Sequence, residues 1–363
     1  MPVAIAIRKI DGKPGAVWYP LERINVAAAA PKPAQVVVKM HAAALNHRDL
    51  FLRQHLYPGT TFGVPLLADG CGVVTDTGDA PEAKEWLGKR VVVNPGSGWK
   101  DDPEGPESPK GYAILGGTKM NPLGTLTDTL TIDASELEEA PRHLSSVEAA
   151  ALPLTGLTAW RAVMTKSGNA KPGRNILVTG IGGGVALMAL LFASAAGANV
   201  FVSSGSEEKI KRAKELGAAG GINYREEGWE KKLQEILPAG RKHVDAIIDG
   251  AGGDVVEKGA KLLRPGGTIV VYGMTTGPKM PFLMSAVLKN IDLRGSTMGS
   301  RKEFADMVQF VATKMVHPVV SRVITDGLNN LEAIDGLFED MKSATQFGKL
   351  VVEITKDQEP SKL

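Results

Sequence analysis

A glycine-rich segment in the middle of the chain has the composition of a phosphate-binding turn. Gly180, Gly182, Gly183 and Gly184 follow a short apolar run, and a second apolar run begins at Val185. Glycines let the backbone approach a pyrophosphate closely, and the free N–H groups at a helix start favour anions. The strict G-x-G-x-x-G pattern is not met, because its last position falls on Val185. The segment predicts a dinucleotide site, and a ligand-free glycine turn is the alternative.

Polar residues after the next apolar run indicate which dinucleotide is bound. An NAD-selective site places an acidic residue there to hold the ribose hydroxyls. Here Ser203 and Ser204 take that place, and Lys209 and Arg212 follow on a predicted helix. Hydroxyl and cationic groups can bind a 2′-phosphate, so the sequence predicts NADPH over NADH. The alternative is that the two cations only solvate a helix face.

Alternating strands and helices are expected to position these residues. Short apolar runs predict strands at 175–179, 198–203, 221–224, 243–249, 268–272 and 291–295. Helical periodicity predicts helices at 185–196, 207–217, 229–237 and 254–263, the last ending at a Pro–Gly turn over 264–267. Six strands in this rhythm form one doubly wound sheet.

The flanking regions differ from this middle part. Residues 1–150 are rich in short strands separated by Pro and Gly, which is typical of an antiparallel β domain, and 101–117 is expected to be an exposed loop. The tail after residue 300 predicts a helix, a strand at 318–324, a helix at 328–341 and a strand at 349–354. It is expected to pack back onto the first domain.

Composition excludes several functional classes. The 42 basic and 40 acidic residues give a formal net charge of +2, which leaves no electrostatic footprint for nucleic acid. No apolar run is long enough to cross a bilayer, and residues 1–12 lack the core of a secretory signal. Cys71 is the only cysteine, so no internal disulfide can form. A protein without nucleic-acid or membrane partners is expected, acting on a small-molecule substrate.

This order of parts resembles the medium-chain dehydrogenase/reductase superfamily over essentially the whole chain. The segments that carry the resemblance are the glycine turn and residues 45–59, 65–74, 152–160, 262–273, 293–300 and 346–354. It implies an α/β fold with a GroES-like β-rich catalytic domain and a Rossmann doubly wound six-stranded parallel sheet. The implied boundaries are 1–150 for the first part of the catalytic domain, 151–300 for the Rossmann domain and 301–363 for the return. The zinc-free quinone-oxidoreductase and enoyl-reductase branches look most similar.

The resemblance also implies that no metal is bound. Members with a structural zinc carry four cysteines in the loop that corresponds to 95–115, and this loop has none. Their catalytic zinc ligands correspond here to Asn46, Ala68 and about Leu154, which are poor zinc ligands. An improvised site remains as an alternative; its members would be His47, Asp49, His55, Asp69 and Cys71.

Residues for the nicotinamide end of the cofactor follow from the same resemblance. Those nominated are Thr155, Thr158, Gly250, Ala251, Gly273, Met274, Met298, Gly299 and Lys349. Tyr224 is expected beside the adenylate phosphate, where quinone reductases place a tyrosine. A packing or turn role is the alternative for each of them.

Hydride chemistry without a metal favours conjugate reduction. Hydride would add to the β-carbon of an activated C=C, and the enolate that develops needs hydrogen-bond donors and a proton source. By resemblance, Tyr57 matches the proton-donating tyrosine of enoyl thioester reductases, and Asn46 can hydrogen-bond substrate or cofactor ribose. The alternatives are a half-buried loop tyrosine and a turn-stabilising asparagine. Arg48 and Asp49 are expected to brace the loop.

The favoured hypothesis is therefore an NADPH-dependent reductase of an enone, enal, quinone or enoyl thioester that works without zinc. An alcohol dehydrogenase-like oxidoreductase of the same superfamily is the second hypothesis, and a catalytically idle NADPH-binding protein is the third. Pairing of the strand at 291–295 with its copy across a two-fold axis predicts a homodimer.

The last residues, Ser361-Lys362-Leu363, match the peroxisomal address that a soluble import receptor reads. They follow a polar stretch that is expected to be accessible to a receptor. The sequence therefore predicts peroxisomal localisation, with the cytoplasm as the alternative. A fluorescent reporter carrying the final dozen or so residues would test this, and a diffuse signal would reject it.

Overall fold

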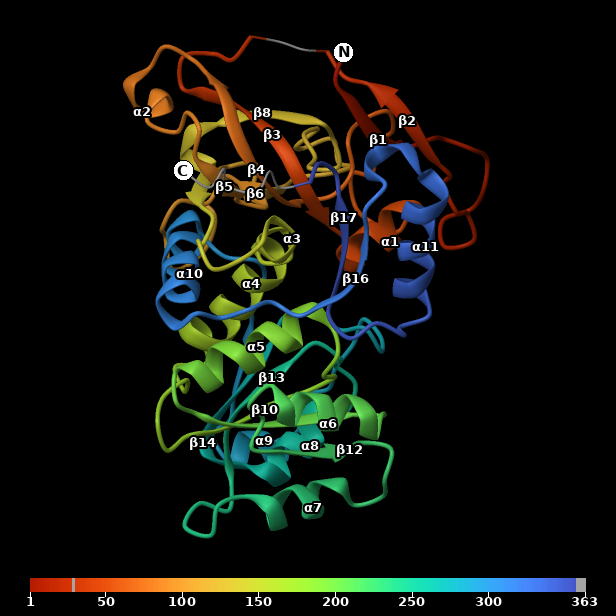
Figure 1. Cartoon of the computed structure of the whole chain (residues 1–363). Coiled ribbons are helices and arrows are strands. Elements are labelled where there is room, and N and C mark those ends of the chain that lie inside the picture. The colour runs from red at the N-terminus through yellow and green to blue at the C-terminus, as the bar shows by residue number, and fades with distance from the viewer. Residues whose placement is uncertain (28–29, 357–363) are drawn as a thin grey trace. The chain divides into compact units, whose positions relative to one another are not determined.

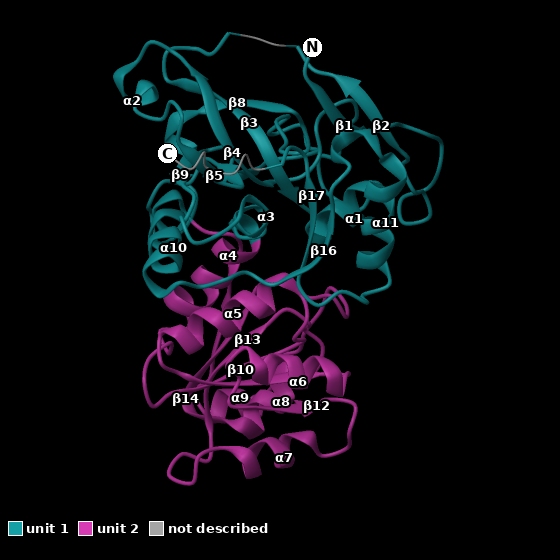
Figure 2. Ribbon diagram, viewed as in Figure 1, with its two compact units in different colours: residues 1–154, 300–363 teal, residues 155–299 magenta. Residues whose placement is uncertain are grey.

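The computed structural model describes residues 1–27 and 30–356. Its internal contacts divide the chain into two compact units (Figure 2). Unit 1 comprises Met1–Leu154 and Ser300–Leu363, and unit 2 comprises Thr155–Gly299. The tripeptide predicted to direct peroxisomal import lies outside the described residues.

Unit 2 is built on a parallel sheet (Figure 1). Its described strands run in the order β12-β11-β10-β13-β14-β15. The strands are β10 (Asn175–Val178), β11 (Asn199–Ser204), β12 (Gly220–Asn223), β13 (Val244–Asp249), β14 (Leu263–Val271) and β15 (Asp292–Gly295). The helices are α5 (Gly184–Ala195), α6 (Glu207–Glu215), α7 (Trp229–Ile236), α8 (Val255–Leu262) and α9 (Met284–Leu288), preceded by a π-helical segment η2 (Arg161–Lys166). This order confirms the predicted Rossmann sheet, in which ligands bind where the strand order reverses, at the carboxyl ends of β10 and β13.

Burial on both faces explains the apolar strands of this sheet. All four residues of β10 and all six of β13 are buried. Leu177, Ile247 and Ile269 form a core with Leu233 of α7 and Val256 of α8. Helices therefore cover the sheet and exclude water from it, as parallel sheets require.

The Pro–Gly turn over 264–267 was predicted to precede the strand, and this is wrong. Residues 264–267 lie inside β14, because Leu263 already pairs with Val244, and pairing resumes two residues along β13, where Thr268 pairs with Ala246. The four intervening residues form an irregularity in the strand. Proline and glycine usually mark the boundary between a helix and a strand, which is why a turn was predicted here. Both residues can also occur within a strand, at a bulge.

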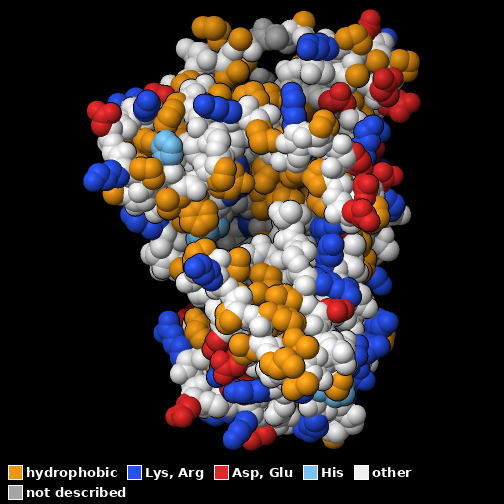
Figure 3. All heavy atoms as spheres, turned by 180° about the vertical axis from the view of Figure 1, so that it is seen from behind, with side chains coloured by type: hydrophobic (Ala, Val, Ile, Leu, Met, Phe, Trp, Pro, Cys, Tyr) orange, Lys and Arg blue, Asp and Glu red, His pale blue; other side chains and the backbone are white. Residues whose placement is uncertain are grey.

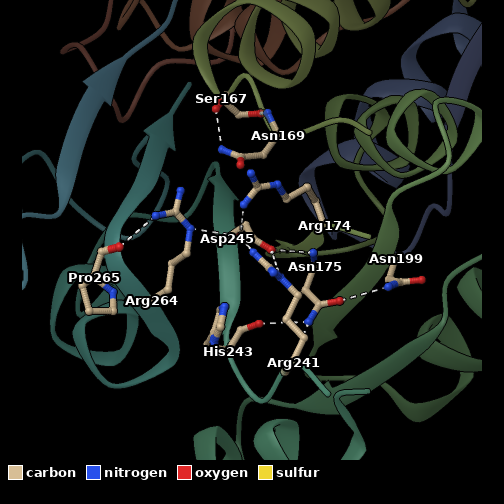
Figure 4. Close-up of polar contacts among 10 residues, drawn as sticks. All are labelled: Ser167, Asn169, Arg174, Asn175, Asn199, Arg241, His243, Asp245, Arg264 and Pro265. Carbon is tan, nitrogen blue, oxygen red and sulfur yellow. Dashed lines mark hydrogen bonds and ion pairs between the residues drawn. The ribbon is translucent and has the colours of Figure 1, made fainter. Parts of the chain in front are cut away.

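A buried carboxylate ties together the amino ends of three strands in unit 2 (Figure 4). Asp245, fully buried in β13, accepts hydrogen bonds from Arg174 Nη1 at 2.8 Å, Arg264 Nε at 3.0 Å and the Asn175 backbone N–H at 2.9 Å. Arg241 adds an Nε contact at 2.9 Å. Burial alone raises the pKa of Asp245, but the hydrogen bonds from Arg241, Asn175 and Arg174 outweigh it and hold that pKa well below its usual range.

Unit 1 contains a sheet in the order β16-β17-β3-β4-β5-β9, with β8 also paired to β3, and two small two-stranded sheets, β1-β2 and β6-β7, within the described ranges. Its strands are β1 (Val3–Ile7), β2 (Leu21–Asn25), β3 (Gln35–Ala44), β4 (Asp69–Thr77), β5 (Arg90–Val93), β6 (Gly96–Ser97), β7 (Ala113–Ile114), β8 (Thr129–Asp133), β9 (Leu137–Glu139), β16 (Val320–Ile324) and β17 (Lys349–Glu353). Its helices are α1 (His47–Arg53), α2 (Pro81–Lys84), α3 (Ser146–Ala150), α10 (Arg301–Lys314) and α11 (Leu331–Lys342), with short 3₁₀ turns η1 (Ala134–Glu136) and η3 (Gly327–Asn329). The helix α4 (Pro153–Trp160) crosses the chain position at which the units divide.

The described strand pairs within residues 1–150 are antiparallel, as predicted. The pair β16-β17, from the part of the chain after residue 300, is parallel. The segment 101–117 is not wholly a loop, because β7 lies within it and pairs with β6. Among the residues that the structure describes, none forms a helix both long enough and apolar enough to cross a bilayer.

Candidate functional site

The glycine turn lies at the carboxyl end of β10, next to the reversal of strand order. Gly180 and Gly182 have φ values of 63° and 128°, in the region that residues with a side chain rarely adopt. Gly183 caps α5 and Gly184 begins it, so the first backbone N–H groups of α5 are presented at this turn. A methyl group added to Gly180 or Gly183 would meet no atom within 4 Å, which leaves the backbone open to a ligand. The turn therefore fits a pyrophosphate.

A cation lies against this turn. A methyl group added to Gly182 would come within 2.9 Å of Lys209 Cδ and 3.3 Å of Lys209 Nζ. Burial lowers the pKa of Lys209, and the neighbouring Arg212 lowers it further. The Ser206 side chain caps α6 by accepting a hydrogen bond from the Lys209 backbone N–H at 3.4 Å, which fixes where that side chain starts. An anion at the turn would meet this positive charge.

The end of β11 is flanked by two further side chains. Ser203 and Ser204 are both buried there. A methyl group added to Gly205 would lie 2.7 Å from Arg225 Nε and 3.0 Å from Tyr224 Oη. Tyr224 was nominated from the sequence, whereas Arg225 was missed. Its position directly after Tyr224, at the end of β12, was the signal that could have identified it.

The loops after β13 and β14 lie against each other. The Thr276 backbone N–H donates to the Ala251 carbonyl at 3.0 Å, and a methyl group on Gly273 would lie 3.3 Å from the Gly250 carbonyl oxygen. A methyl group on Gly252 would lie 3.0 Å from Met274 Cγ. The structure thus brings together four residues nominated for the nicotinamide end: Gly250, Ala251, Gly273 and Met274.

A buried carboxylate joins these loops to the end of β10. Asp249 accepts a hydrogen bond from Thr179 Oγ1 at 2.5 Å and another from the Gly252 backbone N–H at 2.7 Å. Burial raises the pKa of Asp249, although these hydrogen bonds oppose the rise. Sequence analysis did not single out either Asp249 or Thr179, because their pairing joins two strands that are far apart in sequence.

The remaining nominated residues of unit 2 come from α4 and from the segment after β15. Thr155 and Thr158 are buried, and Thr158 Oγ1 lies 3.7 Å from Met298 Sδ. Met298 has a φ of 47°, an uncommon backbone conformation for a residue with a side chain, and Gly299 follows it. Lys349, which was grouped with these residues, belongs instead to unit 1.

In unit 1, strand register brings three polar residues together. Asp69 begins β4 opposite Ala44, and Lys349 begins β17, whose Val351 also pairs with Ala44. Asn46 follows two residues after Ala44 and caps α1. Lys349 Nζ lies 2.6 Å from Asn46 Oδ1 and 2.6 Å from Asp69 Oδ2.

Two further hydrogen bonds complete this polar cluster. Asn46 Nδ2 donates to Asp69 Oδ2 at 2.9 Å, and the Leu154 backbone N–H donates to Asp69 Oδ1 at 2.7 Å. Asn46, Asp69 and Lys349 are 5%, 0% and 4% exposed, respectively. A buried carboxylate and ammonium are stable together only when paired and hydrogen-bonded, which is the case here. We call these three residues the Asn46–Asp69–Lys349 cluster.

The turn of α1 that follows carries a second buried pair. Asp49 Oδ2 accepts the Asn46 backbone N–H at 2.8 Å, and Asp49 Oδ1 lies 3.3 Å from Arg48 Nη1. Burial raises the pKa of Asp49 to about 6 against the opposing effect of Arg48. Arg48 also donates to the carbonyls of Leu115 and Gly116 at 2.8 and 2.9 Å. Arg48 and Asp49 thus connect the start of α1 to the segment after β7.

Tyr57 follows α1 and lies beneath the Arg48 guanidinium. The Arg48 Cζ atom is 4.6 Å from the centroid of the Tyr57 ring. The Tyr57 hydroxyl makes no hydrogen bond to any residue within 1–27 or 30–356, and the ring is half-buried. Its position is therefore set by the ring, and its hydroxyl is available to a ligand.

The donor chemistry of unit 1 does not fit zinc. Three positions correspond to zinc ligands. The Ala68 side chain has no atom that can coordinate zinc, and Leu154 offers a backbone N–H that already donates a hydrogen bond to Asp69. The Asn46 side-chain oxygen is in contact with the Lys349 ammonium group. No three His, Cys, Asp or Glu side chains gather in metal-binding geometry in the described part of the chain. A positive Lys349 beside Asn46 and Asp69 disfavours a second cation there.

The improvised alternative is not assembled either. His47 packs edge-on against the Phe51 ring, with centroids 4.9 Å apart, and burial lowers its pKa. His55 Nδ1 is hydrogen-bonded to the Tyr19 hydroxyl. Each of these two histidines therefore has a structural partner of its own.

Comparison with known proteins agrees with the fold. The alcohol dehydrogenase GroES-like domain family matches residues 32–142, and the zinc-binding dehydrogenase family matches residues 184–313. A protein from Leptosphaeria maculans, named zinc-type alcohol dehydrogenase-like protein YogA, is 51% identical over 98% of this chain and 100% of its own length. A quinone oxidoreductase of Salmonella typhimurium is 30% identical over 71% of this chain and 70% of its own.

A solved structure described as an NAD-dependent alcohol dehydrogenase superposes with a TM-score of 0.83, at 32% identity, over 97% of this chain and 99% of that one. The first family match lies within unit 1, the second covers most of unit 2 and continues to residue 313 in unit 1, and the matches to whole proteins span both units. The chain therefore belongs to the medium-chain dehydrogenase/reductase superfamily and is an oxidoreductase with a nicotinamide-dinucleotide-binding fold.

Proposed function

We propose that this oxidoreductase works without zinc, uses NADPH, and adds hydride to an activated C=C or to a quinone. The observation that carries the proposal is the Asn46–Asp69–Lys349 cluster, in which an ammonium group lies against two residues at or beside the positions corresponding to zinc ligands. Without a Lewis acid, reduction of an enone, enal, quinone or enoyl thioester is the easier hydride reaction, because the acceptor is already polarised. The 30% identity to a protein named quinone oxidoreductase supports this class of substrate.

Each part of the chain then has a distinct task. A reduced nicotinamide, when bound, supplies the hydride. The glycine turn and the first N–H groups of α5 would hold the pyrophosphate, with Lys209 neutralising its charge. The Tyr57 hydroxyl would donate a hydrogen bond or a proton to the substrate. Asn46 would donate from its amide to the substrate or to the ribose.

Preference for NADPH rests on the side chains around Gly205. No acidic residue lies among residues 202–206, and the Arg225 guanidinium and Tyr224 hydroxyl flank the turn where a 2′-phosphate would lie. Guanidinium groups bind phosphate through charge-assisted hydrogen bonds, each worth about 1.5–3 kcal/mol. A 2′-hydroxyl would gain less from the same groups.

We expect Arg225→Gln to lower kcat/KM for NADPH relative to NADH by about tenfold or more, because one charge-assisted hydrogen bond is lost. Steady-state kinetics with both cofactors measures this ratio. Lys211→Gln, on an exposed position of α6, is the matched control for loss of one positive charge. An unchanged ratio in Arg225→Gln would remove this residue from cofactor selection.

The central experiment is a turnover screen with metal analysis. Purified protein would be assayed for NADPH oxidation with a naphthoquinone, an enal and crotonyl-CoA, before and after treatment with a chelator. Turnover that survives the chelator, in protein containing far less than one zinc per chain, supports the proposal. About one tightly held zinc per chain together with chelator-sensitive activity would overturn it.

Two other functions remain distinguishable in this screen. The name of the 51% identical relative favours an alcohol dehydrogenase, which predicts oxidation of alcohols by NAD⁺ or NADP⁺. The hypothesis of a catalytically idle NADPH-binding protein predicts tight cofactor binding without turnover of any acceptor.

We also propose that the protein is imported into peroxisomes and that it forms a homodimer.

A further inference from the structure

The Asn46–Asp69–Lys349 cluster has more donor groups than the protein uses. An ammonium group has three N–H donors and a primary amide has two. The Lys349 ammonium group donates two hydrogen bonds, one to Asn46 Oδ1 and one to Asp69 Oδ2. The Asn46 amide donates one hydrogen bond, to Asp69 Oδ2. One N–H of each group is left without a partner among residues 1–27 and 30–356.

Burial makes these two unused donors significant. Lys349 is 4% exposed and Asn46 is 5% exposed, so little bulk water reaches them. A buried donor without an acceptor carries a desolvation penalty, and a bound acceptor would relieve it. Both donors belong to atoms that share the acceptor Asp69 Oδ2, which keeps the two nitrogens close together. Such a pair can bind one oxygen atom between them.

We propose that Lys349 and Asn46 together form the electrophilic site of this enzyme, which binds the carbonyl oxygen of the substrate through one N–H from each. This inference rests on the proposed function. The ammonium supplies the positive charge that a metal supplies in zinc-dependent members. Asp69 is a positioning residue: it holds both donors through Oδ2 and is itself held by the Leu154 backbone N–H.

The proposed site acts while hydride is transferred to the acceptor. Hydride from the reduced cofactor adds to the β-carbon of the acceptor, the C=C electron pair forms a new C=C to the carbonyl carbon, and the carbonyl π pair moves onto oxygen. The enolate oxygen is stabilised by the Lys349 ammonium and the Asn46 amide. A proton from Tyr57 or water then adds to the α-carbon and the carbonyl re-forms, so the acceptor gains two electrons and the cofactor is oxidised.

Lys349→Met tests this site, because methionine keeps the length of the side chain and removes the charge and the donors. We expect kcat with an enone or a quinone to fall roughly 100-fold, as for the loss of an oxyanion-hole donor. The dissociation constant for NADPH, from cofactor fluorescence, should stay within about threefold. Lys302→Met, which removes an exposed lysine paired with Asp306 on α10, is the control and should keep full activity.

Folding is controlled with a second variant. Lys349→Met leaves the Asp69 carboxylate buried without its cation, so Asp69→Asn with Lys349→Met is made as a neutral pair. Both variants are expected to lose turnover while the neutral pair keeps a normal thermal transition. Lys349→Arg should restore part of kcat, since it restores charge and donors.

The outcomes separate the two proposals. Wild-type protein without turnover of any C=C or quinone acceptor would overturn the proposed function and this site with it. An active wild type whose Lys349→Met variant keeps its kcat would overturn this site alone. Loss of NADPH affinity in place of kcat would also overturn it, and would assign Lys349 to cofactor binding.

Discussion

At the scale of single residues, chemistry concentrates on side chains whose hydrogen bonds are only partly satisfied. Tyr57 is held by its ring beneath Arg48 and has an unpartnered hydroxyl among the described residues. The side chains of Lys349 and Asn46 are each held by hydrogen bonds, and each has one N–H group without an acceptor among the described residues. Asp49 and Asp69, by contrast, accept hydrogen bonds on both carboxylate oxygens. Donors rather than bases therefore dominate the polar groups left open to a substrate.

Tyr57→Phe separates the ring from the hydroxyl. The phenylalanine ring still packs beneath Arg48, so the thermal midpoint should be unchanged. We expect kcat for an enone or enoyl thioester to fall at least about tenfold, because the proton or hydrogen-bond donor is lost. Stopped-flow or steady-state NADPH oxidation measures the effect. A rate equal to that of the wild type would remove Tyr57 from the mechanism.

At the scale of elements, the two ends of the parallel sheet have different roles. Loops at the carboxyl ends of β10, β13 and β14 carry the glycine turn, Asp249 and the nicotinamide candidates. The amino ends carry Asp245 with its arginines, far along the same strands (Figure 4). The hydrogen bonds of Asp245 at the amino ends link neighbouring strands of the sheet, whereas the loops at the carboxyl ends carry the candidate ligand-binding residues.

Asp245→Asn tests the structural network at the amino ends. Removing the charge leaves three arginines without their shared carboxylate, so the free energy of unfolding should fall by about 2–4 kcal/mol at neutral pH. Urea unfolding monitored by circular dichroism measures the change, with Asp292→Asn, which breaks an exposed pair with Arg294, as the control. An effect no larger than that of the control would contradict the assignment.

The pH dependence of this effect has a defined sign. The folded-state pKa of Asp245 is depressed below its ordinary value of 3.8, so its charge stabilises the native state above that pH. As the pH falls from 3.8 through the depressed value, the carboxylate is protonated and the contribution is lost. The difference between wild type and Asp245→Asn should therefore be constant near neutral pH and shrink in acid.

At the scale of the whole molecule, one edge of unit 2 has the features of an interface. All four residues of β15 are exposed, and it is the last strand of its sheet. Apolar side chains near it are also exposed, among them Met284 at 66%, Val287 at 49% and Leu288 at 74%. Figure 3 shows that hydrophobic side chains gather in patches on one face of the molecule. Edge strands with apolar neighbours are usually covered in a folded protein.

The predicted homodimer can be tested through Leu288→Glu. A charge on this exposed apolar position should disfavour pairing of the two β15 edges, because it would be buried without a partner. Light scattering should give twice the chain mass for the wild type and the mass of one chain for the variant. Leu87→Glu, at an exposed leucine of unit 1, is the control and should remain dimeric. A monomeric wild type would reject the prediction.

Much of the fold and part of the candidate site could be predicted from the sequence alone. Alternating apolar runs gave the Rossmann strands within a residue or two at most ends, since a strand buried on both faces must be apolar along its length. The glycine turn was also readable, because positive φ angles at Gly180 and Gly182 demand that residue type. Family membership followed from the order of such local patterns.

Only the tertiary structure decided which distant residues meet. Strand register, and not local sequence, places Lys349 against Asn46 and Asp69, more than 250 residues apart, just as it ties Thr179 to Asp249. Register depends on how whole strands pair, so no local window contains it. The sequence therefore determined the elements and the cofactor class of this protein, whereas the ammonium group beside Asn46 and Asp69 became visible only when three strands were aligned.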